Sequence, residues 1–276
     1  MSRVEVGRIG VALNVSADDT YLEEAAEAER LGYSTIWLPG GQIDGLDRIA
    51  KLVRATTTIP VASAIISADV FTPDAVRDLY ADLQATAPDR FVAGLGGPQQ
   101  PRSMRALNDY LDELDAGEPP VPAERRILAA LGPRKLELAR DRCAGAITLL
   151  VTPAYTSMAR QVLGTDSTLI VDQMCVLDTD AAHARETARG SLRFLSGVGG
   201  YIANFERMGF SDADISELSD RLVDDLVAWG DADAIVTRVT EHLDAGADQV
   251  VLGVLNKGGQ PAPIEVARRL AHRLLG

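Results

Sequence analysis

The segment from Ala129 to Lys135 combines residue types that could bind a phosphate or another anion. It reads Ala-Ala-Leu-Gly-Pro-Arg-Lys: an apolar run ends, Gly132 lets the backbone approach a ligand, and a helix begins. The first turn of a helix offers free N–H groups and the positive end of its dipole. Pro133 at the first helical position loses no hydrogen bond, and Arg134 and Lys135 add charge. An ordinary strand-to-helix turn also favours Gly-Pro, so the pattern alone leaves both interpretations open.

A second glycine-containing segment, Gly94-Leu95-Gly96-Gly97, ends another apolar run. It is compatible with a planar ring lying close over the backbone, and also with a simple tight turn.

The three histidines, His183, His242 and His272, all fall within predicted outer helices. Neither a Ser-His-Asp triad nor a metal site is therefore expected, and each histidine is interpreted as a surface or packing residue. The two cysteines lie far apart and outside any CxxC pair. This spacing argues against a disulfide framework and fits a reducing cytoplasm.

Short apolar runs alternate with helical patterns and indicate which elements position these residues. Helix signals separate the runs, such as the start at Thr72-Pro73-Asp74 and the glycine Gly32 after a helix over 20–31. Strands rich in Val, Ile, Leu and Ala on both faces are typical of a parallel sheet covered by helices. The eight predicted strands are residues 9–13, 34–38, 61–66, 90–95, 127–131, 146–151, 169–177 and 249–255.

Eight strands in strict alternation with helices predict an α/β fold, a closed (β/α)8 or TIM barrel, as a single domain over residues 1–276. A mostly helical insertion is expected at 180–245, between strands seven and eight, and residues 263–275 form the closing helix. An open doubly wound sheet is the competing architecture. The turn at 13–16 after the first strand, Leu-Asn-Val-Ser, lacks the glycine pattern of a dinucleotide fold, which favours the barrel.

In an α/β barrel the functional site is built from the loops at the C-terminal ends of the strands. This rule selects a short set of positions: Asn14, 40–42, 63–67, 96–100, 131–135, 152–155, Gln173 and Asn256.

The overall composition excludes several classes of partner. The net charge is −13, and no long basic run is present, so neither nucleic acid nor an anionic membrane is an expected partner. The longest apolar runs have the length of buried strands, and the N-terminus shows no secretory signal. We therefore expect a cytoplasmic protein that acts on a small molecule.

Several segments, in this order, resemble the luciferase-like monooxygenase superfamily, and within it the coenzyme F420-dependent oxidoreductases. They are EAERLGYSTIWLPGG (27–41), PDRFVAGLGG (88–97), YLDELDAG (110–117), and the longer stretches 127–146, 163–177 and 220–255. The resemblance runs along nearly the whole chain. It implies a (β/α)8 barrel, in agreement with the strand count, and a homodimer.

The resemblance also implies a function, namely hydride transfer between a deazaflavin (F420), or alternatively FMN, and a small organic substrate. It places a non-proline cis peptide near Ser63-Ala64-Ile65, against the cofactor ring. Asn14, Gln173 and Tyr155 are candidates for handling the accompanying proton. The cofactor-binding residues that it implies are Ser63, Ala64, Leu95, Gly96, Gly97, Ala130, Leu131, Gly132, Pro133, Arg134 and Thr152.

The chain departs from that family at three places. Residues 97–101 read Gly-Pro-Gln-Gln-Pro where relatives carry a serine-histidine pair, residues 147–153 lack a His-Pro-Tyr run, and 154–156 read Ala-Tyr-Thr instead of Glu-His-Thr. A barrel that binds a ligand or partner without turnover is thus a second hypothesis. An aldolase or isomerase is a third, with Lys257 as the sole lysine near a strand end.

The acidic net charge fits poorly with the anionic F420 unless basic residues gather locally. Arg102, Arg105, Arg134 and Lys135 are the candidates for such a patch.

Overall fold

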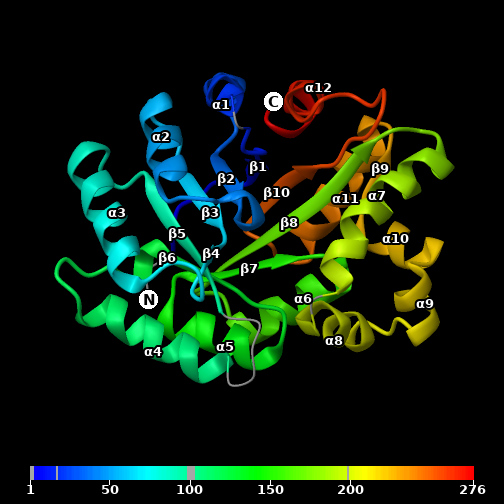
Figure 1. Cartoon of the computed structure of the whole chain (residues 1–276). Helices are drawn as coiled ribbons and strands as arrows, with labels where there is room; N and C mark the ends of the chain where they lie inside the picture. The colour runs from blue at the N-terminus through cyan, green and yellow to red at the C-terminus, as the bar shows by residue number, and fades with distance from the viewer. Residues whose placement is uncertain (1–2, 17, 98–102, 198) are drawn as a thin grey trace.

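The computed structural model describes residues 3–16, 18–97, 103–197 and 199–276, and its parallel strands close into a barrel (Figure 1). The last strand of the barrel pairs with the first, Val250 opposite Ile9, and also with β8, Gln249 opposite Ile170. The predicted (β/α)8 architecture is therefore confirmed. The eight strands of the barrel are β1 (Ile9–Ala12), β2 (Thr35–Pro39), β3 (Val61–Ala64), β5 (Phe91–Gly96), β6 (Arg126–Ala129), β7 (Gly145–Leu149), β8 (Thr168–Leu177) and β10 (Gln249–Val254).

Helices follow the strands and cover the outside of the barrel (Figure 1). The signal at Thr72-Pro73 is confirmed, because the Thr72 side chain accepts a hydrogen bond from Ala75 N at the start of α3. The regular helices of the first six units are α1 (Thr20–Leu31), α2 (Asp47–Ala55), α3 (Pro73–Thr86), α4 (Ser103–Ala116), α5 (Pro133–Arg142) and α6 (Pro153–Leu163). Two 3-10 turns, η1 (Gly40–Gln42) and η2 (Ala123–Arg125), and the closing helix α12 (Pro263–Leu274) complete these units.

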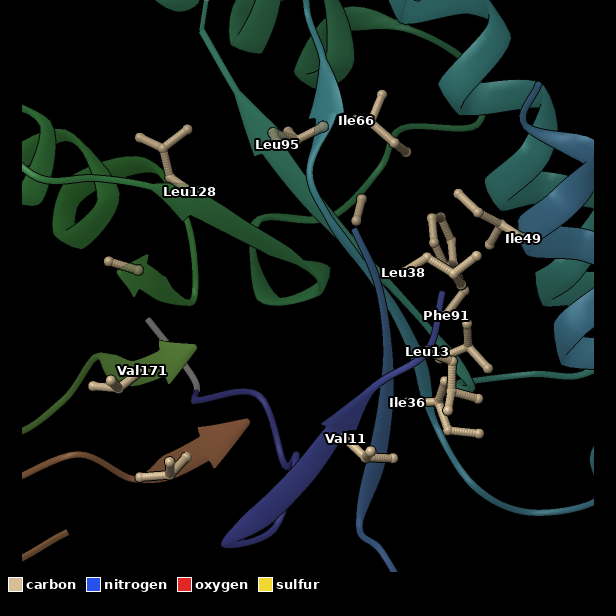
Figure 2. Packing of buried hydrophobic residues seen from close by; sticks show 14 of the residues in the cluster. Val11, Leu13, Ile36, Leu38, Ile49, Ile66, Phe91, Leu95, Leu128 and Val171 are labelled. Carbon is tan, nitrogen blue, oxygen red and sulfur yellow. The ribbon is translucent and has the colours of Figure 1, made fainter. Parts of the chain in front are cut away.

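The main core lies between the outer face of the barrel and these helices. Val11, Leu13, Ile36 and Leu38 point outward from β1 and β2 or their ends and, like Ile49 of α2, are almost fully buried (Figure 2). Burial of such side chains contributes about 1.5–3 kcal/mol each. The two faces of each strand are both buried, which explains the nearly continuous apolar runs.

A separate, smaller core fills the interior of the barrel. Trp37, Ile127, Ile170 and Val251 meet there, and Trp37 Nε1 donates a hydrogen bond to Gln249 Oε1 over 2.9 Å. Because successive residues of a strand point to opposite faces, the inward positions of β8 are Ile170, 172 and 174. Interior packing leaves the C-terminal mouth as the place where a ligand can enter.

Residues between β8 and β10 form a layer beside the barrel with its own apolar cluster, which includes Leu192, Phe205 and Leu222. The segment is mostly helical, as predicted, but it also contains a short strand that pairs in parallel with the end of β8. Its elements are α7 (Ala181–Ser196), α8 (Gly199–Arg207), α9 (Asp212–Glu217), α10 (Asp220–Leu226), β9 (Ala228–Gly230) and α11 (Ala232–Asp244).

Several predicted boundaries were wrong. The third predicted strand, 61–66, is interrupted after Ala64, and the chain resumes as β4 (Ile66–Ser67), which pairs with β5. The buried residues of α11 are Ile235, Val239 and His242, and His242 Nε2 contacts Gln173 Oε1 over 2.8 Å in the core. Within the described residues, none of the helices is both long and apolar enough to span a bilayer.

Candidate functional site

A cavity of about 780 Å³ opens at the C-terminal mouth of the barrel. Its wall is made by the β3–β4 junction, the ends of β5, β6 and β7, the middle of β8, and helix α8 from the segment beside the barrel. The volume lies within the usual range of about 300–1,000 Å³ for small-molecule and cofactor sites. The position agrees with the rule that barrel enzymes build their sites at this end.

One wall of the cavity is the junction of β3 and β4, where Ala64 and Ile65 are joined by the predicted non-proline cis peptide bond. A Cβ atom on Gly96 would overlap the Ile65 side chain, so the glycine at the end of β5 is what allows Ile65 to occupy this place. Ala64, Ile65, Gly96 and Gly97 thus form a nearly apolar face of the cavity.

The turn from β6 into α5 forms the opposite, cationic side of the cavity. Gly132 is the residue before the helix, Pro133 is its first residue, and Ala130 to Lys135 all line the space. Lys135 is half-buried, and burial lowers the pKa of its ammonium group. The nearest atom to a Cβ built on Gly132 would be Arg207 Nη2, 4.0 Å away, so the space in front of this glycine is open.

Arg207 reaches this turn from the end of α8 and was missed by the sequence analysis. Its Nη1 donates a hydrogen bond to Asn204 Oδ1 over 2.7 Å, which orients the guanidinium group from one turn earlier in the helix. Asn204 is itself fully buried, and its Nδ2 has no partner within the described residues. Together with Arg134 and Lys135, Arg207 gives the turn three cationic side chains.

The three proton-handling candidates lie elsewhere. Asn14 is exposed and accepts a hydrogen bond from Gln42 Nε2 over 2.9 Å. Gln173 points out of the barrel, where its Oε1 contacts His242 Nε2 at 2.8 Å. The Tyr155 hydroxyl donates a hydrogen bond to the carbonyl oxygen of Leu131 and so holds the backbone of the cationic turn in place. None of the three side chains is part of the cavity wall among the described residues.

Three of the predicted cofactor-binding residues support the cavity without lining it. Leu95 is buried in the outer core. Thr152 caps α6 by accepting a hydrogen bond from Tyr155 N over 3.2 Å. The Ser63 hydroxyl bonds to both backbone polar groups of Gly94, which holds β3 to β5 beside the junction.

Asp172 is the residue that the sequence analysis overlooked in favour of its neighbour Gln173. Its carboxyl group lines the cavity, and its Oδ1 is buried without a hydrogen-bond partner among the described residues. Burial raises the pKa of this carboxyl to about 7. Strongly shifted pKa values in a cavity mark candidate functional groups. The signal in the sequence was a single acid within an apolar strand.

Other predicted positions are not part of the cavity wall as described. Residues 98–102, which include Gln100 and Arg102 of the predicted loop and patch, lie outside the described residues. Arg105 is 82% exposed and pairs with Asp109, away from the cavity. Over residues 3–16, 18–97, 103–197 and 199–276, no cluster of three or more His, Cys, Asp or Glu side chains has the spacing of a metal site.

No protein-family model and no curated protein sequence matches the chain. Solved structures do match it over nearly full length. The coenzyme F420-dependent tetrahydromethanopterin reductase from Methanopyrus kandleri has a TM-score of 0.71 at 14% identity, covering 97% of this chain and 99% of that one.

Two further solved enzymes match in the same way. An F420-dependent secondary alcohol dehydrogenase, in complex with an F420-acetone adduct, has a TM-score of 0.72 at 14% identity and covers 100% of both chains. The oxygenating constituent of 3,6-diketocamphane monooxygenase from Pseudomonas putida, in complex with FMN, has a TM-score of 0.68 at 12% identity and covers 97% of both. The chain therefore shares the barrel fold of these F420-dependent and FMN-binding enzymes, as its resemblance to the luciferase-like superfamily predicts.

Proposed function

We propose that this protein is an oxidoreductase that binds F420 or FMN in the cavity at the mouth of its barrel and transfers a hydride to or from a small organic substrate. The observation that carries the proposal is the division of one cavity into an apolar face and a cationic turn. Ile65 and Gly96 stand on the first side, and Gly132 and Arg207 on the second. A molecule with a flat ring and a phosphate arm has this distribution of polarity.

The residues present fit such a cofactor. The phosphate would be held by the backbone at Gly132, the N-terminal turn of α5, and the side chains of Arg134, Lys135 and Arg207. The ring would lie against the apolar face formed by Ala64, Ile65, Gly96 and Gly97. When bound, the cofactor supplies the redox chemistry, while the chain orients the reactants and excludes water.

The cationic turn favours F420 over FMN. Three cationic side chains converge on a turn that carries no carboxylate among its described residues. The F420 phosphate and acidic tail present more negative charge than the single phosphate of FMN, and close opposite charges gain energy in proportion to their number. The net charge of −13 would repel an anionic cofactor at long range. Solvent ions screen that repulsion, so the nearby cations of the turn have the larger effect on binding.

A fluorescence-quenching titration tests the proposal. Purified protein is titrated separately with F420 and with FMN, and we expect saturable quenching by at least one of them. Absence of binding to either cofactor up to about 50 μM would contradict the oxidoreductase function and favour a barrel that binds a different ligand without turnover.

The same titration on two glycine variants tests the position of the cofactor. Gly132→Val places a branched side chain in the open space in front of the cationic turn. Because this side chain would occupy the position of the phosphate, the variant should not bind the cofactor. Gly190→Val on the exposed face of α7 meets no atom within 4 Å and is the matched control. Equal affinities of the two variants would refute the phosphate site at Gly132.

A further inference from the structure

Asp172 brings a carboxyl group into the mouth of the barrel beside the apolar side chains of Ile147 and Leu149. It is the sole carboxylate among the described residues that line the cavity. Its place on β8 is opposite Leu149, the last residue of β7, and Ile147 and Leu149 form the neighbouring wall. The cationic turn follows β6, two strands away, or about 10 Å at the usual spacing of strands.

The carboxyl group is closely packed on the side of β10. A Cβ built on Gly253 would lie 2.8 Å from Asp172 Oδ1, so a side chain at position 253 would force the carboxyl group to move. Oδ1 has no hydrogen-bond partner among the described residues, although nearly all buried polar atoms in proteins have one. Oδ1 is thus enclosed by protein, and the other carboxyl oxygen, Oδ2, is the one that can meet a ligand in the cavity.

The groups around Asp172 do not stabilise a negative charge. The titratable neighbours are Tyr201 from α8 and Cys175 on the same strand, and both are neutral at pH 7: burial and the nearby Asp172 charge raise the pKa of each. Arg207 lines the same cavity but is directed to Asn204. Burial is the cause that raises the pKa of Asp172 itself, to about 7. Its protonated form therefore persists to neutral pH and can donate a hydrogen bond.

We propose that Asp172 recognises the substrate, and that the substrate presents an uncharged hydrogen-bond acceptor, such as a ketone or aldehyde oxygen, to the protonated carboxyl group. This inference rests on the proposed function, because it concerns what occupies the part of the cavity that the cofactor leaves free. The apolar wall at Ile147 and Leu149 suits the carbon skeleton of such a substrate.

A cationic ligand is the alternative that the geometry disfavours. An amine would need the ionised carboxylate, and burial in an apolar wall penalises that form. The two alternatives predict opposite responses to pH: a neutral acceptor binds more tightly when Asp172 is protonated, and an amine binds more tightly when it is ionised.

The test compares two probes of similar size, acetophenone and benzylamine, by ligand-observed NMR at about pH 5.5 and about pH 8.5, on either side of the titration. The wild-type affinity for acetophenone should fall about tenfold at the higher pH, as loss of one donated hydrogen bond implies. Asp172→Asn keeps a donor that does not titrate, so its affinity should not change with pH. Asp172→Leu should bind weakly at both pH values.

Two results would overturn the inference. One is benzylamine binding that strengthens as the pH rises, and the other is an acetophenone affinity that does not depend on pH in the wild type. Infrared difference spectra give a second readout: the wild type should show a protonated carboxyl band that disappears through neutral pH, and Asp172→Asn should lack it.

A titration of both variants with F420 and FMN separates this inference from the proposed function. Cofactor affinity close to that of the wild type in Asp172→Leu supports a substrate contact. A tenfold or greater loss would assign the hydrogen bond to the cofactor ring and overturn the substrate assignment. Failure of the wild type to bind either cofactor would refute the proposed function, while the pH response of acetophenone would still test Asp172.

Discussion

The Ser63 hydroxyl bonds to both backbone polar groups of Gly94. It donates to the Gly94 carbonyl oxygen over 2.9 Å and accepts from the Gly94 N–H over 3.0 Å. Regular pairing of β3 with β5 covers Val61 and Ala62 and resumes only at Ile66 in β4. One side chain therefore takes the place of the ladder in the gap between the two strands, directly behind the cavity wall.

Ser63→Ala should destabilise the protein by about 1–3 kcal/mol, because it leaves the buried N–H and C=O of Gly94 without partners. Urea denaturation followed by circular dichroism measures the change. Ser216→Ala removes a hydroxyl from an exposed helix position and serves as the control. A loss of stability no greater than that of the control would mean that water or a local shift satisfies Gly94.

Gly94→Ala should be more damaging than Ser63→Ala. A Cβ on Gly94 would overlap the Ser63 carbonyl oxygen, which is backbone and cannot move aside like a side chain. Overpacking of this kind costs about 1–3 kcal/mol or more. In contrast, Gly190→Ala in the exposed part of α7 meets nothing within 4 Å and should stabilise the helix by up to about 1 kcal/mol. The melting temperature should therefore fall in Gly94→Ala and rise in Gly190→Ala.

Arg207→Ala should weaken cofactor binding about tenfold, because it removes one of three cations at the turn. The protein should remain folded, because the exposed Arg207 side chain contributes little to packing. Quenching titrations at low and high salt measure the effect, and the variant should show a smaller salt dependence than the wild type. Arg193→Ala, an exposed cation on α7, is the control. If both variants keep wild-type affinity, the anion site does not include α8.

His242 should make the fold sensitive to acid. It is fully buried between Thr156 and Gln173, and burial lowers its pKa to about 3. Below about pH 6.5 this histidine binds a proton in the unfolded chain but stays neutral in the native chain. The free energy of unfolding therefore falls as the pH drops towards 3. Between pH 6.5 and 5 the loss of stability due to His242 amounts to about 2 kcal/mol.

The measurement is the free energy of unfolding of His242→Gln and wild type between pH 5 and 7. The variant should lose less stability on acidification. His272→Gln, which changes an exposed histidine on α12, should keep the wild-type slope. Parallel curves for all three proteins would show that His242 is protonated in the native state.

The architecture was determined by the sequence itself. Eight apolar runs separated by helix signals give the closed barrel, because each strand must bury both faces and each helix one. The helix start at Thr72 and the turn at Gly132 are local, since the hydrogen bonds and the dihedral angles that define them involve only a few neighbouring residues. For that reason the position of the cationic turn could be predicted without tertiary information.

What faces the cavity was decided by the tertiary structure. In 169–171 of β8 every residue is apolar, so the sequence does not reveal which face is inside; a shift of one residue exchanges Asp172 with Gln173. Arg207 comes from a helix more than seventy positions after Gly132, and only the packing of α8 over the mouth brings them together. Local signals fix the elements, whereas the closure of the barrel and its added helices select which side chains meet.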